Sequence, residues 1–231
     1  MKRLTAVLLV TAAFAAAASA EDVMPPDYRG LPGSTTQEWD FVTDGDLAFD
    51  TVFVYTAPDG ASGITHNPYA TPGNWDFVVD CSETGIGYWL DGAGPGDGGA
   101  WYDFDAMMAE VPNTGRWEEG TWKDLRIQIT YWDPTGAGPP ILNVRNEMPA
   151  WPVDNWTVGL GNDWRVYVED WRIEPNPMYE YVDIYGATAP AQESYAISEV
   201  VIDTRCVPEP ATMALLGLGL AGLVAKRKRR P

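Results

Sequence analysis

The sequence predicts an all-β protein built as a β-sandwich, with a jelly-roll arrangement favoured. From Trp39 onward, apolar residues come in short or alternating runs that are separated by Gly, Pro, Asn and Asp. The chain holds 23 Gly and 19 Pro, which is typical of many short strands joined by turns. It has no internal repeat of fixed period, which disfavours a propeller.

The first residues have the three parts of a secretory signal peptide. A short basic region, Met1 to Arg3, is followed by an apolar run at residues 4–17 and by the small residues Ala18-Ser19-Ala20. This order predicts a signal peptide at residues 1–20 that is cut after Ala20.

The exported part, residues 21–206, is long enough for one domain with a full core. It contains 8 Lys and Arg against 32 Asp and Glu, a net charge of about −24. A surface of this sign excludes nucleic acid as a partner, because phosphate contacts require basic residues. It suits solubility outside the cell and loose binding of divalent cations.

Residues 21–36 contain Pro and Gly with little apolar periodicity, which predicts an extended N-terminal arm before a sandwich at residues 37–206. A period of two is clearest in residues 125–132, where apolar and polar side chains alternate. We expect strands at residues 51–56, 74–81, 85–90, 125–132, 164–169, 181–185 and 195–203. Residues 104–111 include good helix formers and are the one place where a helical turn is expected.

The two cysteines, Cys81 and Cys206, both lie in the exported part and lack a Cys-x-x-Cys spacing. In an oxidising compartment an intramolecular disulfide is the default interpretation. The alternative is two separate thiols, one of which could couple to another chain.

Aromatic residues are abundant, with 11 Trp and 11 Tyr, all between Tyr28 and Tyr195. Aromatic rings stack on the apolar faces of sugars while polar neighbours bond the hydroxyls, so a carbohydrate-binding surface is one interpretation. Its candidate residues are Trp132, expected to point outward from a strand, and Trp117, Trp122 and Trp151 on flanking loops. The alternative is that these rings fill the core.

The glycine-rich loop at residues 90–100 carries Asp91 and Asp97, whose carboxylates could bind Ca²⁺. Their spacing matches neither an EF-hand nor the nonapeptide calcium repeat, so a solvated loop is favoured and no cofactor is assigned.

Catalysis has little support in the sequence. The only histidine is His66, and no Gly-x-Ser-x-Gly elbow surrounds a serine, so nucleophilic triads and most zinc sites are disfavoured. We therefore expect no enzyme activity. The alternative is a polysaccharide-active enzyme with paired carboxylates, for which Glu118-Glu119 and Glu169-Asp170 are candidates.

The C-terminal tail, residues 207–231, has three parts in a fixed order. Val207-Pro208-Glu209-Pro210 precedes an apolar run at residues 211–225, and five Lys and Arg follow at residues 226–230. This pattern predicts a membrane helix whose end stays in the cytoplasm. At 1.5 Å per residue the run reaches roughly 22 Å, short of the bilayer core, so the anchor is weak.

This tail resembles the sorting signal of PEP-CTERM proteins of Gram-negative bacteria. The resemblance implies that an exosortase recognises Pro208, Glu209 and Pro210 and removes the tail from a membrane-anchored precursor. It further implies a place at the cell surface or in the extracellular matrix, together with exopolysaccharide. We expect a structural or carbohydrate-binding protein with possible polysaccharide partners and no nucleic-acid partner.

Overall fold

The computed structural model describes residues 23–31, 33–39, 41, 46–49, 52–55, 77–80, 88–90, 92–95, 99–112, 121–177, 179–186 and 195–208. The predicted signal peptide and the tail after Pro208 lie outside these residues. Within the described ranges, the protein has no helix that is long and apolar enough to cross a membrane.

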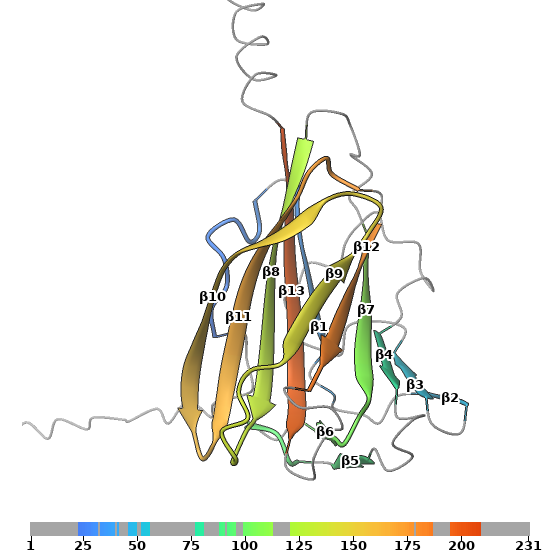
Figure 1. Ribbon diagram of the computed structural model, residues 1–231, viewed down its shortest axis with the longest axis vertical. Helices are drawn as coiled ribbons and strands as arrows, with labels where there is room; N and C mark the ends of the chain where they lie inside the picture. The colour runs from blue at the N-terminus through green and yellow to red at the C-terminus, as the bar shows by residue number, and fades with distance from the viewer. Residues whose placement is uncertain are drawn as a thin grey trace, which may run out of the picture.

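The described chain forms two antiparallel sheets, which we call sheet A and sheet B (Figure 1). Sheet A has the order β10 (Ala150–Gly161), β11 (Trp164–Ile173), β8 (Thr121–Trp132), β13 (Ala196–Pro208), β6 (Ala100–Tyr102) and β5 (Tyr88–Leu90), with β1 (Ser34–Trp39) also paired to β13. Sheet B has the order β2 (Asp46–Phe49), β3 (Val52–Tyr55), β4 (Phe77–Asp80), β7 (Ala106–Pro112), β12 (Tyr179–Tyr185) and β9 (Ile141–Arg145). The prediction of an all-β protein is confirmed.

The sheets pack face to face over one core. In β8, Leu125, Ile127 and Ile129 are buried, and they belong to the same apolar cluster as Phe77 and Val182 of sheet B. Because side chains alternate across a strand, the neighbours of these β8 residues point outward from sheet A. The period of two in residues 125–132 therefore indicates the expected strand with an apolar core face, although Gln128 and Thr130 on the outer side are buried as well.

The strands differ from the expectation in two ways. The helix formers at residues 104–111 lie largely in β7, where Met107 and Ala109 are buried on the core face of sheet B. Burial between two sheets outweighs the weak intrinsic preference of Ala and Met for helix. Five further strands, β1, β2, β6, β9 and β10, were not expected. The longest of them, β10, is solvent-exposed along most of its length and shows no alternation.

The chain turns from β10 into β11 through Asn162 and Asp163, whose φ angles are 51° and 65°. Two consecutive positive φ angles define a tight hairpin turn whose twist matches the flanking strands, and Asn and Asp tolerate this conformation. The turn fixes β10 as the edge strand beside β11.

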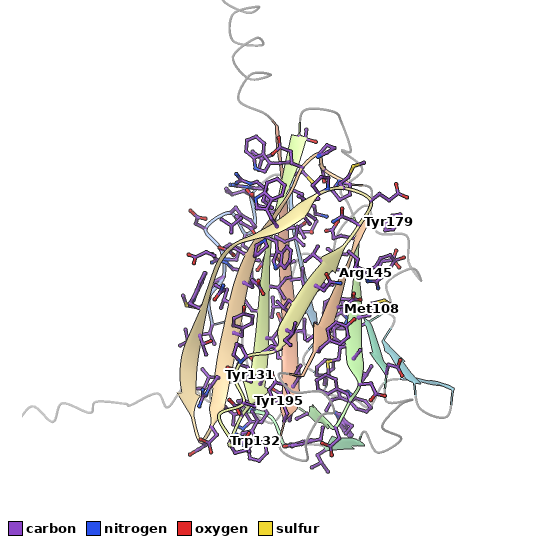
Figure 2. All side chains as sticks on the ribbon, in the orientation of Figure 1. Met108, Tyr131, Trp132, Arg145, Tyr179 and Tyr195 are labelled. Carbon is purple, nitrogen blue, oxygen red and sulfur yellow. The ribbon has the colours of Figure 1, made fainter. Side chains whose placement is uncertain are left out.

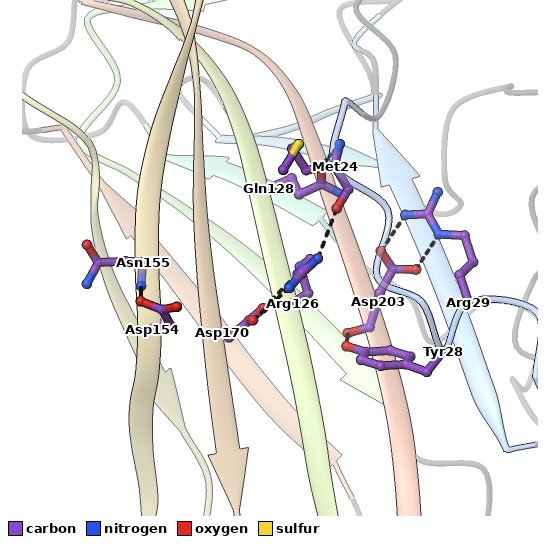
Figure 3. Close-up of polar contacts among 9 residues, drawn as sticks. All are labelled: Met24, Tyr28, Arg29, Arg126, Gln128, Asp154, Asn155, Asp170 and Asp203. Carbon is purple, nitrogen blue, oxygen red and sulfur yellow. Dashed lines mark hydrogen bonds and ion pairs between the residues drawn. The ribbon is translucent and has the colours of Figure 1, made fainter.

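The segment before β1 packs on the outer side of sheet A (Figure 3). The backbone N–H of Met24 donates to Gln128 Oε1 at 2.9 Å, and Arg29 Nε donates to Asp203 Oδ1 at 2.7 Å. Burial and the Asp203 carboxylate raise the pKa of the Tyr28 hydroxyl, which donates to the Asp203 carbonyl at 3.4 Å. Residues 23–31, in the predicted arm, are thus attached to β8 and β13, and β1 begins at Ser34.

One glycine of the loop at residues 90–100 is required by packing. A Cβ atom on Gly99 would lie 2.1 Å from Trp89 Nε1 and 2.3 Å from the Phe41 carbonyl oxygen, both impossible contacts. Trp89 Nε1 donates to this carbonyl at 2.9 Å. Gly99 therefore lets β6 approach the Trp89 ring of β5.

Candidate functional site

Five tryptophans share the outer face of β8, β10 and β11, and we call this surface the tryptophan face. The strand registers place alternate residues of these three strands on the outer side of sheet A, where Val166 and Val168 are nevertheless buried. The members are Trp122, Trp132, Trp151, Trp156 and Trp164. Trp151 is 40% exposed and the other four are half-buried, so the rings line the surface and do not fill the core.

At one end of the tryptophan face, two arginines share one carboxylate. Arg172 Nη2 and Arg205 Nη2 donate to Asp124 at 2.8 and 3.3 Å. The guanidinium of Arg172 also lies over the Trp122 ring, 5.1 Å from its centroid, and Arg172 is in register with Trp151. These contacts hold the Arg172 guanidinium over the Trp122 ring.

In the middle of the face, Arg126 and Asp170 form a bidentate ion pair. Both hydrogen bonds, from Arg126 Nε and Nη2, are 2.7 Å long. The Arg126 guanidinium lies over the Trp156 ring at 4.9 Å from its centroid. The pair orders polar groups beside an aromatic ring without leaving an unpaired charge.

At the far end, Trp132 and Trp164 are directly opposite each other in the register of β8 and β11. The Tyr102 ring meets Trp132 edge-on, with centroids 6.1 Å apart, and Figure 2 labels Trp132 at this end. Trp122 lies ten residues away on the same strand, roughly 33 Å at 3.3 Å per residue. The candidates Trp122 and Trp132 therefore share a face without forming one compact subsite.

The outer face of sheet B carries a second aromatic group that the sequence analysis missed. Tyr179 and Tyr181 of β12 meet edge-on at 5.6 Å, and Arg145 lies over the Tyr181 ring at 5.3 Å (Figure 2). Arg145 Nη2 donates to Asp183 Oδ1 at 2.7 Å, and Asn143 Nδ2 donates to Asp183 Oδ2 at 3.2 Å. The available signal was that Tyr or Asp occupies every second position of residues 179–185, between Glu, Val and Ile.

A buried ion pair joins the two sheets inside the core. Lys123 of β8 contacts the Glu180 carboxylate of β12, and both side chains are 0% exposed. Burial raises the pKa of Glu180, and the Lys123 charge opposes that shift. The sequence signal was present, because the period of two in β8 places Lys123 on the same side as Leu125.

The adjacent acids Glu169 and Asp170 point to opposite faces of β11. Asp170 binds Arg126 on the tryptophan face, whereas Glu169 points inward and accepts a hydrogen bond from the Tyr167 hydroxyl at 3.1 Å. Burial raises the pKa of Glu169. Successive residues of a strand alternate between faces, so these carboxylates do not form the facing pair that the enzyme hypothesis requires.

Several predicted residues lie outside the described part of the chain: Trp117, Glu118, Glu119, His66, Asp91, Asp97, Cys81, Glu209 and Pro210. Among the residues that are described, no group of three or more His, Cys, Asp or Glu could hold a metal ion. The calcium and catalytic predictions at the other positions stay predictions.

The disulfide also stays a prediction, because the structure describes Cys206 but describes the chain near Cys81 only as far as Asp80. Cys206 lies on β13 opposite Lys123, near the end of the strand. β4 ends at Asp80, which is in register with Ala106 at the start of β7. A disulfide requires Cα atoms within about 7 Å. The pairing would therefore require the chain after Asp80 to reach the Cys206 end of the sandwich.

The last strand runs directly into the predicted sorting motif. β13 stays paired with β8 as far as Pro208, which lies opposite Thr121, so the motif begins before the strand ends. No curated protein and no solved structure matches the chain. A family model described as the PEP-CTERM protein-sorting motif matches residues 207–230. The chain therefore carries a PEP-CTERM sorting signal and is an exported protein sorted by an exosortase.

Proposed function

We propose that this exported protein is a non-catalytic component of the cell surface or extracellular matrix that binds polysaccharide through its tryptophan face. The observation that carries the proposal is the gathering of five tryptophans on one side of three neighbouring strands. Tryptophans with no role at the surface would be expected in the core, where Trp39 and Trp101 are fully buried.

The chemistry of this face suits sugars. Indole rings stack on the apolar faces of pyranose rings, and the ordered guanidinium and carboxylate groups between them can bond hydroxyls. The rings extend along β8 and β11 for roughly 30 Å, a length that suits an extended chain better than a single sugar. The ligand class is therefore a polysaccharide.

The same face offers little for hydrolysis. Asp124 and Asp170 each accept hydrogen bonds from arginines, and they are not opposite each other in the strand register. A glycosidase needs two carboxyl groups that face each other across the scissile bond. Binding without cleavage is the function that these contacts support.

The strand order supports a jelly-roll assignment for the sandwich. Sheet A contains the series β1-β13-β8-β11 and sheet B the series β7-β12-β9, with the chain crossing between sheets after β7, β8, β9, β11 and β12. This interleaving of a four-strand and a three-strand series resembles a jelly roll in which the eighth strand, β10, pairs with β11 in sheet A, and β2 to β6 are an insertion between β1 and β7. Jelly rolls recur in lectin domains, which agrees with the proposed ligand class.

The tail gives the proposed route to the surface. The signal peptide at residues 1–20 starts export, residues 211–225 hold the precursor in the membrane, and an exosortase recognises Pro208, Glu209 and Pro210 and removes the tail. Glu209→Ala should leave the tail attached, which is visible as a larger membrane-bound form on an immunoblot. Normal processing of that variant would contradict the assigned role of the motif.

A polysaccharide array tests the binding role. The purified exported protein is compared with the variant Trp132→Ala/Trp156→Ala/Trp164→Ala, which we expect to lose at least about tenfold in affinity, or about 1.4 kcal/mol. The matched control, Tyr179→Ala/Tyr185→Ala, removes exposed rings from the other sheet and should bind normally. Absence of binding to every polysaccharide would overturn the proposal, and loss in the control alone would move the site to sheet B.

A further inference from the structure

We call the end of the sandwich from which β13 leaves the exit end. Only a short stretch of chain separates it from the apolar run of the tail. β13 is paired through Pro208, and the apolar run begins at Ala211, three residues later. An extended chain spans at most ~3.6 Å per residue, so the run begins within about 11 Å of Pro208. Wherever the apolar run enters a bilayer, the exit end must lie close to its surface.

Exposed apolar side chains lie around the exit end. Leu31 is 50% exposed, Met148 is 36% exposed and Val153 is 60% exposed. They come from two segments, the one before β1 and the one that leads into β10, and we call these three side chains the rim. Isolated exposed apolar residues are ordinary. Apolar residues at the point where a predicted membrane segment begins, however, are placed to contact lipid.

Backbone contacts place these two segments at the exit end. Leu31 precedes Gly33, whose carbonyl accepts a hydrogen bond from the Cys206 N–H at 3.2 Å. Met148 lies in the turn before β10, and Val153 lies near the start of that strand. In Figure 1 the end of β13 and the start of β10 lie at the same end of the molecule.

Two arginines at this end can meet lipid phosphates. Arg172 and Arg205 have side chains that are 40% and 35% exposed, and they share the single carboxylate of Asp124. The exposed acids Glu147 and Glu174 lie at the same end, next to Met148 and to the Pro149 carbonyl, so the two arginines offer individual phosphate contacts and not a net positive charge. Arginine beside aromatic and aliphatic side chains is the composition that favours the headgroup layer of a membrane.

We propose that the exit end rests on the lipid surface in the membrane-anchored precursor. Leu31, Met148 and Val153 enter the headgroup layer, and Arg172 and Arg205 lie near the phosphates. The inference rests on the proposed insertion of residues 211–225 into the membrane. The strands then stand roughly along the membrane normal, with the Trp132 end of the tryptophan face directed away from the bilayer. Removal of the tail leaves only these side-chain contacts, so the mature protein can depart.

The test is hydrogen exchange on the full chain in vesicles of phosphatidylethanolamine and phosphatidylglycerol. The control variant carries a twelve-residue Gly-Ser insertion between Pro210 and Ala211, which separates the sandwich from the membrane by roughly 20 Å on average. We expect residues 29–33 and 146–153 to exchange several-fold more slowly in the natural chain than in the control. The turn at residues 133–138, at the opposite end, should exchange equally in both.

A second variant has the natural connection between Pro210 and Ala211, without the Gly-Ser insertion, and changes only the rim: Leu31→Asp/Met148→Asp/Val153→Asp. These positions are exposed, so the fold should be retained, and the variant should lose the protection at residues 29–33 and 146–153. Flotation with the vesicles separates the two hypotheses. A natural chain that floats but exchanges like the control overturns the docking, whereas a chain that does not float overturns membrane insertion itself.

Discussion

The charged pairs inside the sandwich and those on its faces are built from similar groups but stand in opposite environments. Lys123 and Glu180 are both 0% exposed and connect the two sheets through the core. The Arg145 side chain, which pairs with Asp183 on the outer face of sheet B, is 51% exposed. Water can solvate the second pair if it separates, but it cannot reach the first.

The difference shows which charges are available for binding. Lys123 and Glu180 are shielded from water and contact each other instead. Glu180 Oε2 has no hydrogen-bond partner among the described residues. Such a pair constrains how β8 and β12 face each other and cannot contact a ligand. The arginines of the face pairs are partly exposed, so they remain accessible to the ligands proposed above.

The largest expected effect is at the core pair. Lys123→Met leaves the Glu180 carboxyl buried without its counter-charge, which should lower the free energy of unfolding by about 3–5 kcal/mol at neutral pH. The double variant Lys123→Met/Glu180→Leu should recover most of that loss, because apolar groups of similar volume replace both charges. Urea denaturation measures both, and equal stability of the single and double variants would contradict the comparison.

An intermediate effect is expected where one partner is buried and the other is half-exposed. The Arg29 side chain is 24% exposed and binds Asp203, whose side chain is 0% exposed. Arg29→Ala should cost about 2 kcal/mol, since the Asp203 carboxylate keeps its hydrogen bond from Thr36 but loses a charged donor. The same variant should raise hydrogen exchange in residues 23–31, and unchanged exchange there would contradict their attachment through Arg29.

A smaller, pH-dependent effect is expected at Glu169. Burial raises its pKa in the folded protein above the ordinary value of 4.5, so the protonated form is favoured by folding. The contribution of Glu169 to stability is therefore greatest below pH 4.5 and is lost as the pH rises through the raised value. As the pH rises from 4.5 through the raised pKa, the Glu169→Gln variant should become more stable relative to the natural protein. The gain should be about 1.4 kcal/mol for each unit by which folding raises the pKa of Glu169. If the urea midpoints of the variant and of the natural protein differ by the same amount at pH 4 and at pH 7, this prediction is contradicted.

The smallest effect is expected for a pair whose arginine is exposed. Arg145→Ala should change the free energy of unfolding by less than about 1 kcal/mol, because the Arg145 charge is solvated and screened by salt and the buried Asp183 keeps its hydrogen bond from Asn143. A denaturation curve compared with that of Lys123→Met is the direct measurement. A loss as large as that of the core variant would remove the distinction between the two environments.

The strands with one buried face could be read from the sequence, because burial imposes a period of two. This holds best for β8, whose inner residues include Leu125, Ile127 and Ile129. In β11 and β13 the outer residues Val168 and Val201 are buried as well, so alternation in the sequence did not reveal which side faces the core. The edge strand β10 could not be found this way, since both of its faces are solvated and nothing selects alternation. In β7, the preference of Met107 and Ala109 for helix gave the wrong expectation, because tertiary burial decided the structure.

The candidate site was predicted only in part. The alternation in β8 places Trp132 outward, as expected, and the same register adds Trp122 to that face. The contributions of Trp156 and Trp164 depend on how β10 and β11 align with β8, and that alignment is a long-range pairing. Sequence distance was misleading for Glu169 and Asp170, which are neighbours in the chain but lie on opposite sides of a sheet.

The sequence by itself determined the sorting tail, the all-β class and the inward or outward direction of side chains in the strands with one buried face. These depend on local order, on composition and on a period of two, all of which are properties of consecutive residues. Only the tertiary structure decided which strands are neighbours, that the tryptophans share a face, and that Lys123 meets Glu180. Those contacts join residues far apart in the chain, and they are selected by the packing of two sheets over one core.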